Sequence, residues 1–164
     1  MSSASFTLLR RHGLWVVLLS SLFILLSAHL YERFTGLMPC QLCWLQRWVF
    51  VGFAGLALLA LPLVRWRWAR WMFSGLFALL SLLGIAIAMR HLYIKLNPQT
   101  VSCGMDVETL LNFMPLFDAL KHMLIGSSDC AQAANLLGLP LPSWSMAGYL
   151  VLGFLALWSL LGRR

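Results

Sequence analysis

Charged side chains are scarce in this chain of 164 residues. They make up 10% of the sequence, whereas hydrophobic residues make up 61%. A soluble globular domain usually carries about 25% charged residues. The scarcity of charge therefore excludes an ordinary soluble domain, and the sequence predicts an integral membrane protein.

Four long apolar runs take the place of the missing charge. They cover about 14–30, 43–64, 71–89 and 144–161, and each is near the roughly 20 residues that a helix needs to cross the hydrocarbon core. Because helices satisfy their own backbone hydrogen bonds in lipid, we expect an all-α membrane protein: a four-transmembrane-helix bundle in a single domain, residues 1–164. The first run is longer than the core of a usual signal peptide, and no A-x-A site closes it, which favours a retained span.

Acidic residues are scarcer still, at five against twelve lysines and arginines. All five fall on one side of the expected membrane, and seven arginines flank the other side: Arg10, Arg11, Arg65, Arg67, Arg70, Arg163 and Arg164. The positive-inside rule predicts cytoplasmic termini and outward loops at about 31–42 and 90–143. Cations spread along membrane flanks do not form the clustered surface that nucleic acid needs, so we expect no nucleic-acid partner.

Cysteine is also rare, and none of the four cysteines is expected at mid-membrane or in the cytoplasm. Cys40 and Cys43 lie where the first outward loop meets the second span, and Cys103 and Cys130 lie in the second outward loop. An even number of thiols on an oxidising side predicts disulfide chemistry. Of three possible pairings, proximity in the chain favours Cys40 with Cys43, which leaves Cys103 with Cys130.

A metal site fits this spacing poorly. Structural zinc sites use two close pairs of ligands, and Cys103 and Cys130 are far apart in the chain. Haem attachment needs a histidine where Trp44 stands. We therefore expect no metal. A C-x-x-C dithiol closes a small ring that suits reversible redox exchange and contributes little as a staple, so a redox role is favoured over structural disulfides.

Cys43 is the cysteine that we expect to meet an electron acceptor. It lies at the N-terminus of the second span, where unpaired backbone N–H groups favour a thiolate, and Arg47 follows one turn later on the same face. Arg47 can also hydrogen-bond an acceptor's oxygen, although snorkelling to lipid headgroups is the competing explanation. Cys40 precedes the helix, and we expect it to be the more exposed of the two.

The second outward loop holds an apolar stretch, 110–124, in which Asp118, Lys121 and His122 share one side if the part after Pro115 is helical. We expect a short interfacial helix at the membrane surface. A hydrophobic plug for the bundle is the alternative.

Taken together, Pro39-Cys40-Gln41-Leu42-Cys43 followed by Gln46-Arg47, with Cys103 and Cys130 in one long outward loop and four spans, resembles the disulfide bond formation protein B (DsbB) family over about 14–161. The resemblance implies a multi-pass enzyme of the bacterial inner membrane with its active cysteines on the periplasmic side. The implied activity is quinone-dependent thiol:disulfide oxidation, which reoxidises a DsbA-like thioredoxin-fold partner and uses ubiquinone or menaquinone.

The resemblance also implies roles for particular residues. The partner's thiolate attacks a Cys103–Cys130 disulfide and binds Cys103, Cys130 then attacks Cys40, and Cys43 is released as a thiolate facing the quinone. Arg47 is placed at a quinone carbonyl. His91 is placed near the quinone as a hydrogen-bond or proton donor, and an ordinary interfacial histidine is the alternative.

Two other classes fit part of the pattern. A vitamin K epoxide reductase-like enzyme also has four spans, a C-x-x-C and a second cysteine pair, but it places the loop cysteines before the C-x-x-C. A non-catalytic scaffold with two structural disulfides is the more distant alternative, and cysteines that stay oxidised beside a reduced partner would favour it.

Overall fold

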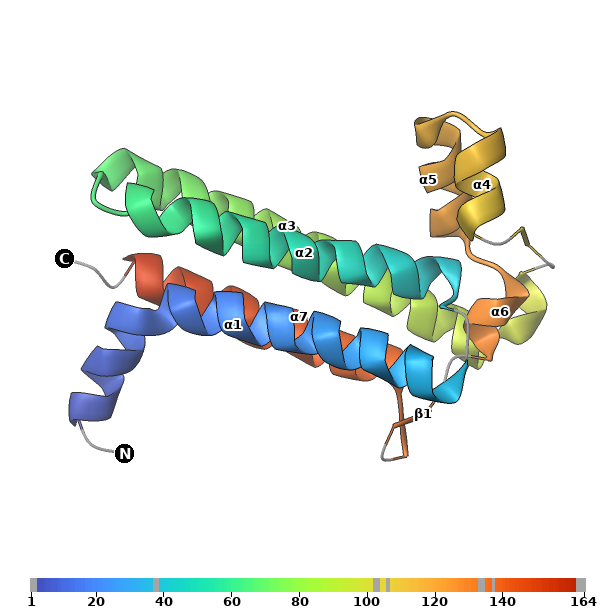
Figure 1. The fold of residues 1–164 in the computed structure, drawn as a ribbon, viewed down its shortest axis with the longest axis horizontal. Coiled ribbons are helices and arrows are strands. Elements are labelled where there is room, and N and C mark those ends of the chain that lie inside the picture. The colour runs from blue at the N-terminus through green and yellow to red at the C-terminus, as the bar shows by residue number, and fades with distance from the viewer. Residues whose placement is uncertain are drawn as a thin grey trace.

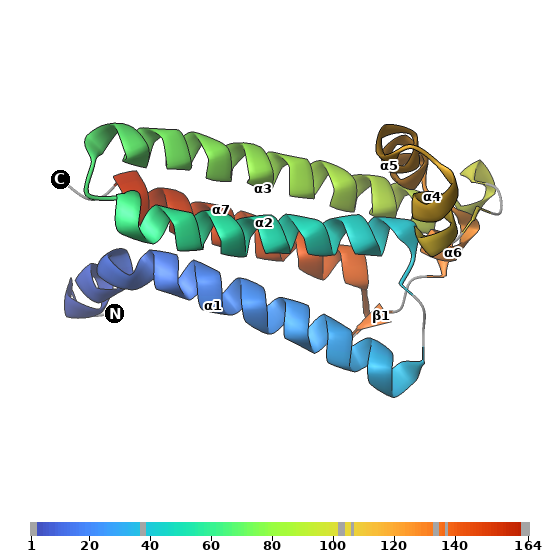
Figure 2. The same cartoon turned by 45° about the horizontal axis from the view of Figure 1, so that its top comes forward.

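Four long helices run side by side in the computed structural model of this chain (Figure 1, Figure 2). They are α1 (Ser3–Thr35), α2 (Gln41–Leu63), α3 (Arg67–Leu96) and α7 (Leu141–Leu161). The structure describes residues 3–36, 39–101, 104–105, 107–132, 135–136 and 138–161. Each of the four helices contains a segment long and apolar enough to cross a membrane. The predicted all-α class and four-helix bundle are confirmed.

Helices α1 and α3 each contact both α2 and α7. Aromatic rings fill the centre of this bundle. The ring centroids of Phe53 and Phe77 lie 5.8 Å apart, and those of Phe50 and Tyr149 lie 4.6 Å apart. Gly84 lets α3 approach α7, because a Cβ at this position would meet the Tyr149 ring at 2.9 Å. Such small residues at helix contacts are typical of membrane bundles, where close backbone approach supplies the packing energy.

The outer surface of the bundle is apolar. Large hydrophobic side chains, including Leu19, Phe23, Leu58 and Leu79, are exposed along the four long helices. A monomeric soluble protein rarely exposes so much contiguous apolar surface. The exposure suits a surface in contact with lipid.

Helix α3 continues beyond the predicted span of 71–89 and ends at Leu96. Asn97 leaves the helix with φ −130° and ψ 66°, because the ring of the following Pro98 disfavours the helical region for the residue before it. His91 therefore lies on α3 and inside the bundle, whereas the sequence placed it at the start of the outward loop.

The start of α1, the end of α7 and the turn between α2 and α3 lie together at one end of the bundle (Figure 1). The start of α2 and the end of α3 lie at the other end, which we call the site end. This arrangement is compatible with both termini on one side of a membrane. That this side is cytoplasmic stays a prediction.

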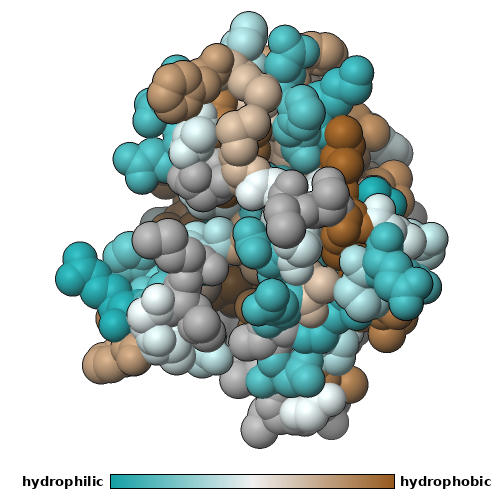
Figure 3. Space-filling view, turned by 90° about the vertical axis from the view of Figure 1, so that its right-hand side faces the viewer, coloured by the Kyte–Doolittle hydropathy of each residue, from teal (hydrophilic) through white to brown (hydrophobic). Residues whose placement is uncertain are grey.

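The connection from α3 to α7 folds over the site end. It contains η1 (Pro98–Thr100), α4 (Val107–Phe113), α5 (Leu116–Ile125), α6 (Ser128–Ala131) and the antiparallel pair β1 (Asn135–Leu136) and β2 (Leu139–Pro140). Helices α4 and α5 project sideways, across the long axis of the bundle (Figure 1). Seen end-on, the site end shows hydrophilic side chains around scattered apolar ones (Figure 3).

Helix α5 is the short helix expected after Pro115. It buries Ala119 and Met123, while Leu116 and Phe117 are exposed. The exposed side chains argue against a plug inside the bundle. Its position at a membrane surface stays a prediction.

Candidate functional site

The C-x-x-C dithiol is built into the first turn of α2. Cys40 is the N-cap residue, with an extended backbone, and its Sγ accepts a hydrogen bond from the backbone N–H of Cys43 at 3.4 Å. The two Sγ atoms lie 2.9 Å apart as free thiols. The two-residue spacer, one helical turn long, brings both sulfurs to one face, where the unpaired N–H groups of the helix start favour negative charge on sulfur.

Cys130 joins this dithiol although it is distant in the chain. Helix α6 carries it against α2 and α3, and its Sγ lies within 4.8 Å of both the Cys40 Sγ and the His91 Nε2. Cys130 is fully buried. The structure therefore brings together three of the four cysteines singled out from the sequence. The fourth, Cys103, lies outside the described residues.

A tight connection holds α6 in place. Gly126 follows α5 with φ +81°, a conformation that favours glycine, and a Cβ there would meet Ile94 Cδ1 at 2.6 Å and Leu42 Cδ1 at 3.2 Å. The backbone thus passes close to α2 and α3 just before Cys130. This close passage positions the thiol.

The segment that follows Cys103 in the chain contacts the same region. The side-chain amide of Gln41 donates a hydrogen bond to the Met105 carbonyl at 2.5 Å, and a Cβ on Gly104 would meet the Cβ of Ser127 at 2.6 Å. The two parts of the loop that flank its cysteines therefore meet over the start of α2.

The relative exposure of the two C-x-x-C cysteines was predicted wrongly. Cys40 is only 9% exposed, whereas Cys43 is partly exposed. The reason is tertiary, because Cys130 on α6 and His91 on α3 cover Cys40. An incoming thiol cannot reach Cys40 directly in this arrangement, but the Cys130 sulfur is already beside it.

His91 lies against the cysteines and is fully buried. Its Nε2 is 3.7 Å from the Cys40 Sγ and 3.2 Å from the Cys130 carbonyl oxygen, and its Nδ1 is 3.2 Å from the Gln46 Nε2. With the amide in this orientation, Gln46 donates to Nδ1, so the ring proton of neutral His91 is on Nε2. The Nε2–H therefore donates to the Cys130 carbonyl oxygen at 3.2 Å, and the Cys40 sulfur at 3.7 Å is a second, more distant acceptor.

Gln46 is itself held in place and is one of the residues whose role the sequence did not reveal. It is buried, and its backbone carbonyl accepts a hydrogen bond from the Tyr149 hydroxyl at 2.9 Å. A glutamine within a predicted span was the available signal, because polar residues inside a membrane are costly and usually have a partner.

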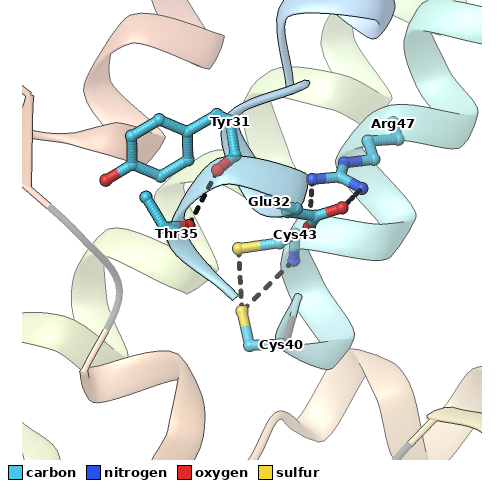
Figure 4. A network of polar contacts seen from close by, with 6 residues as sticks. All are labelled: Tyr31, Glu32, Thr35, Cys40, Cys43 and Arg47. Atoms are coloured by element: carbon cyan, nitrogen blue, oxygen red, sulfur yellow. Dashed lines mark hydrogen bonds and ion pairs between the residues drawn. The ribbon is translucent and has the colours of Figure 1, made fainter. Parts of the chain in front are cut away.

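Arg47 forms an ion pair with Glu32 at the end of α1 (Figure 4). One guanidinium nitrogen, Nη1, donates to Glu32 Oε2 at 2.7 Å, and Nη2 pairs with Oε1, so the contact is bidentate. Figure 4 shows the pair beside the sulfurs of Cys40 and Cys43. Glu32 was recognised only as an outward-side acid, because helix-to-helix pairing leaves no trace in sequence spacing.

The pKa values of Cys130 and Cys40 shift in opposite directions. The hydrogen bond from the Cys40 thiol lowers the pKa of Cys130 to about 6; burial opposes this shift, and backbone N–H groups of Ser127 and Leu42 assist it. Hydrogen bonds with Cys130 and Cys43, together with burial, raise the pKa of Cys40. The arrangement favours a Cys130 thiolate beside a protonated Cys40. The Cys130 thiolate is thus a nucleophile held next to the Cys40 sulfur.

Comparisons with known proteins relate this chain to one family. The sequence profile of the family described as disulfide bond formation protein DsbB matches residues 10–159. The disulfide bond formation protein B of Alkalilimnicola ehrlichii is 45% identical over 157 residues, which covers 96% of this chain and 97% of that protein. Its counterpart in Chromohalobacter salexigens is 35% identical over 93% of this chain and 91% of that protein. No solved structure matches the chain significantly.

Proposed function

This chain belongs to the disulfide bond formation protein DsbB family, and on that premise we propose that it is a quinone-dependent thiol:disulfide oxidoreductase. It reoxidises a soluble DsbA-like, thioredoxin-fold protein and passes the electrons to ubiquinone or menaquinone in the bacterial inner membrane. The observation that carries the proposal is the position of Cys130, whose sulfur lies within 4.8 Å of the Cys40 sulfur at the start of a membrane helix.

The proposed relay begins in the loop. A thiolate of the reduced partner attacks a Cys103–Cys130 disulfide, forms a mixed disulfide with Cys103 and releases Cys130 as a thiolate. The second thiol of the partner then displaces Cys103, and the partner leaves oxidised. The contacts of Gly104 with Ser127 and of Gln41 with Met105 support this pairing, because they bring the flanks of both loop cysteines together.

The second exchange moves the electrons to the membrane helix. The Cys130 thiolate attacks the Cys40 sulfur of a Cys40–Cys43 disulfide, forms a Cys40–Cys130 bond and releases Cys43 as a thiolate. The low pKa of Cys130 supports the attack. The His91 Nε2, 3.7 Å from the Cys40 Sγ, supports the exchange that follows, since an N–H there can stabilise the negative charge that Cys40 acquires when Cys103 displaces it from Cys130. Cys103 then recovers Cys130 and leaves Cys40 reduced.

The electrons need an acceptor, because each thiol exchange is nearly reversible. About 30 mV corresponds to a tenfold change in such an equilibrium, and a DsbA-like protein at about −120 mV is already a strong oxidant. A quinone supplies a stronger two-electron oxidant within the membrane.

The side chains present around Cys43 fit a quinone. Cys43 is partly exposed on α2, and Glu32 takes two of the five N–H donors of the Arg47 guanidinium, which leaves others for a carbonyl oxygen. Trp44 and Trp48 add an aromatic surface, with ring centroids 5.3 Å apart, although aromatic residues also gather at membrane interfaces. Arg47 would orient the acceptor, and Cys43 would deliver the electrons.

The proposal is tested with protein purified in detergent and a soluble quinone whose absorbance reports its reduction. Reduced DsbA-like protein is added to the wild type and to Cys43→Ser. Quinone reduction that requires both the partner and Cys43 is the expected result. If folded wild-type protein reduces no quinone while its cysteines stay oxidised, the scaffold is favoured instead; reduction of an epoxide substrate would favour the vitamin K epoxide reductase-like alternative.

A further inference from the structure

Two thiols and an imidazole, which are common zinc ligands, lie close together at the site end. We infer that the fully reduced protein binds one thiophilic divalent cation, of which Zn²⁺ is the natural example, through Cys40, Cys130 and His91, with Cys43 completing the site. This inference is independent of the proposed activity, because it needs only the reduced thiols and their geometry.

The donor atoms are already close to the spacing of a tetrahedral site. The Sγ atoms of Cys40 and Cys130 and the Nε2 of His91 lie within 4.8 Å of one another, and the separation of Cys40 Sγ from His91 Nε2 is 3.7 Å. Zn–S bonds near 2.3 Å and Zn–N bonds near 2.0 Å place tetrahedral ligands about 3.5 to 3.8 Å apart. The three donors therefore need only small movements to surround one ion.

Cys43, in the first turn of α2, supplies the fourth ligand by turning toward the ion, because its sulfur lies outside the group of three donor atoms that are within 4.8 Å of one another. Its sulfur lies 2.9 Å from that of Cys40 and moves outward when both coordinate an ion, and a two-residue spacer is the usual separation of paired cysteine ligands. The sequence argument against zinc rested on the distance between Cys103 and Cys130. The fold removes that objection, because Cys130 meets the C-x-x-C pair and His91 contributes the nitrogen.

The surroundings of His91 suit a metal ligand. When Nε2 binds an ion, Nδ1 carries the proton and needs an acceptor, and such partners orient most ligating histidines. The Gln46 amide lies 3.2 Å from Nδ1, and its oxygen reaches that position if the amide turns over. Tyr149 holds the Gln46 carbonyl, so α2 stays in place while the amide turns.

Burial and charge also favour the ion. Cys130 and His91 are fully buried, and Cys40 is nearly so, so few water molecules compete for the ligands. Three thiolates and a neutral imidazole around a divalent cation leave one negative charge, and Arg47 lies one turn from Cys43 on α2. Each thiol that coordinates releases its proton. Coordination also occupies the sulfurs that disulfides require, so the ion and oxidation exclude each other.

The test uses the full-length protein in detergent, reduced and freed of reductant under nitrogen, and titrated with Co²⁺ as a spectroscopic probe. A tetrahedral thiolate site gives a sulfur-to-cobalt charge-transfer band. We expect one Co²⁺ per chain, displacement by Zn²⁺, and no band in the oxidised protein. An equal band in oxidised protein, or none in reduced protein that is folded, overturns the inference.

Two variants with equal numbers of thiols identify the ligands. Cys130→Ser should weaken Co²⁺ binding at least tenfold, and Cys103→Ser should leave it within about twofold of the wild type. Equal losses in both would overturn the assignment. X-ray absorption of the zinc-loaded wild type gives a readout that needs no variant. A shell of sulfur with one nitrogen supports the site, and a shell of oxygen and nitrogen alone contradicts it.

Discussion

At the scale of single residues, the most unequal pair of neighbours is Cys40 and Cys130. The Cys40 hydrogen bond holds the Cys130 pKa at about 6, against an ordinary value of 9.0. A folded-state pKa below the unfolded value adds stability as the pH rises from about 6 toward 9, and this contribution is lost as the pH falls through 6. Reduced protein should therefore unfold more easily at pH 5 than at pH 8.

The same hydrogen bond predicts a direct titration. In reduced Cys43→Ser protein, with a chelator present, thiolate ultraviolet absorbance should rise with a midpoint near pH 6. Replacing Cys40 by alanine in that background removes the hydrogen bond and should move the midpoint upward toward 9. A midpoint that does not respond to Cys40→Ala would show that another group controls Cys130.

Arg47 carries a second prediction at this scale. Arg47→Leu removes a charge-assisted donor, which is worth about 1.5 to 3 kcal/mol, so the KM for quinone should rise about tenfold or more. Thiol exchange between the partner and the loop cysteines should stay nearly unchanged, because the ion pair of Arg47 is with Glu32 on α1.

Glu32→Gln is the matched control for Arg47→Leu. It breaks the same ion pair but keeps the guanidinium. If both substitutions raise the KM for quinone equally, the ion pair matters for structure and Arg47 does not hold the acceptor.

At the scale of elements, the connection between α5 and α6 decides where Cys130 lies. Gly126→Ala combines a strained positive φ with a clash against Ile94. Gly138→Ala has the same φ of +81° but open space around its Cβ, so it costs only the strain of about 1 to 2 kcal/mol. We expect Gly126→Ala to slow formation of the Cys40–Cys130 disulfide at least tenfold and Gly138→Ala to leave its rate almost unaltered. Trapping this disulfide by rapid alkylation measures both rates.

The long helices and α5 were predictable from sequence, but the other elements of the loop were not. A span must be apolar over a minimum length and must satisfy its own backbone, and both conditions can be read locally. Helices α4 and α6 are short, and their positions depend on contacts between residues far apart in the sequence. The close approach of Gly126, just before α6, to Ile94 on α3 is an example. The cysteines could be singled out by residue type. The ion pair of Glu32, the contacts of Gln46 and the burial of Cys40 depend on packing between helices, so the sequence did not reveal them.

At the scale of the whole molecule, topology is the property still predicted from charge alone. Arg65, Arg67 and Arg70 lie at the turn between α2 and α3 or in the first turn of α3, at the end of the bundle where α1 starts and α7 ends (Figure 1). The positive-inside rule places that end in the cytoplasm. A reporter that is active only in the periplasm should be active when inserted after Thr100 and inactive when fused to the C-terminus. The reverse pattern would place the cysteines on the reducing side and contradict the proposed function.

In the proposed relay, the residue that caps the N-terminus of α2 is a cysteine whose sulfur changes its bonding partner. Cys40 accepts the backbone N–H of Cys43, and an N-cap contributes about 1 kcal/mol to the first turn of a helix. Each disulfide that Cys40 enters alters its capacity as an acceptor, so the end of a membrane helix should tighten and fray in step with turnover. Amide hydrogen exchange at the start of α2 would then report the redox state of the protein without any probe of the thiols.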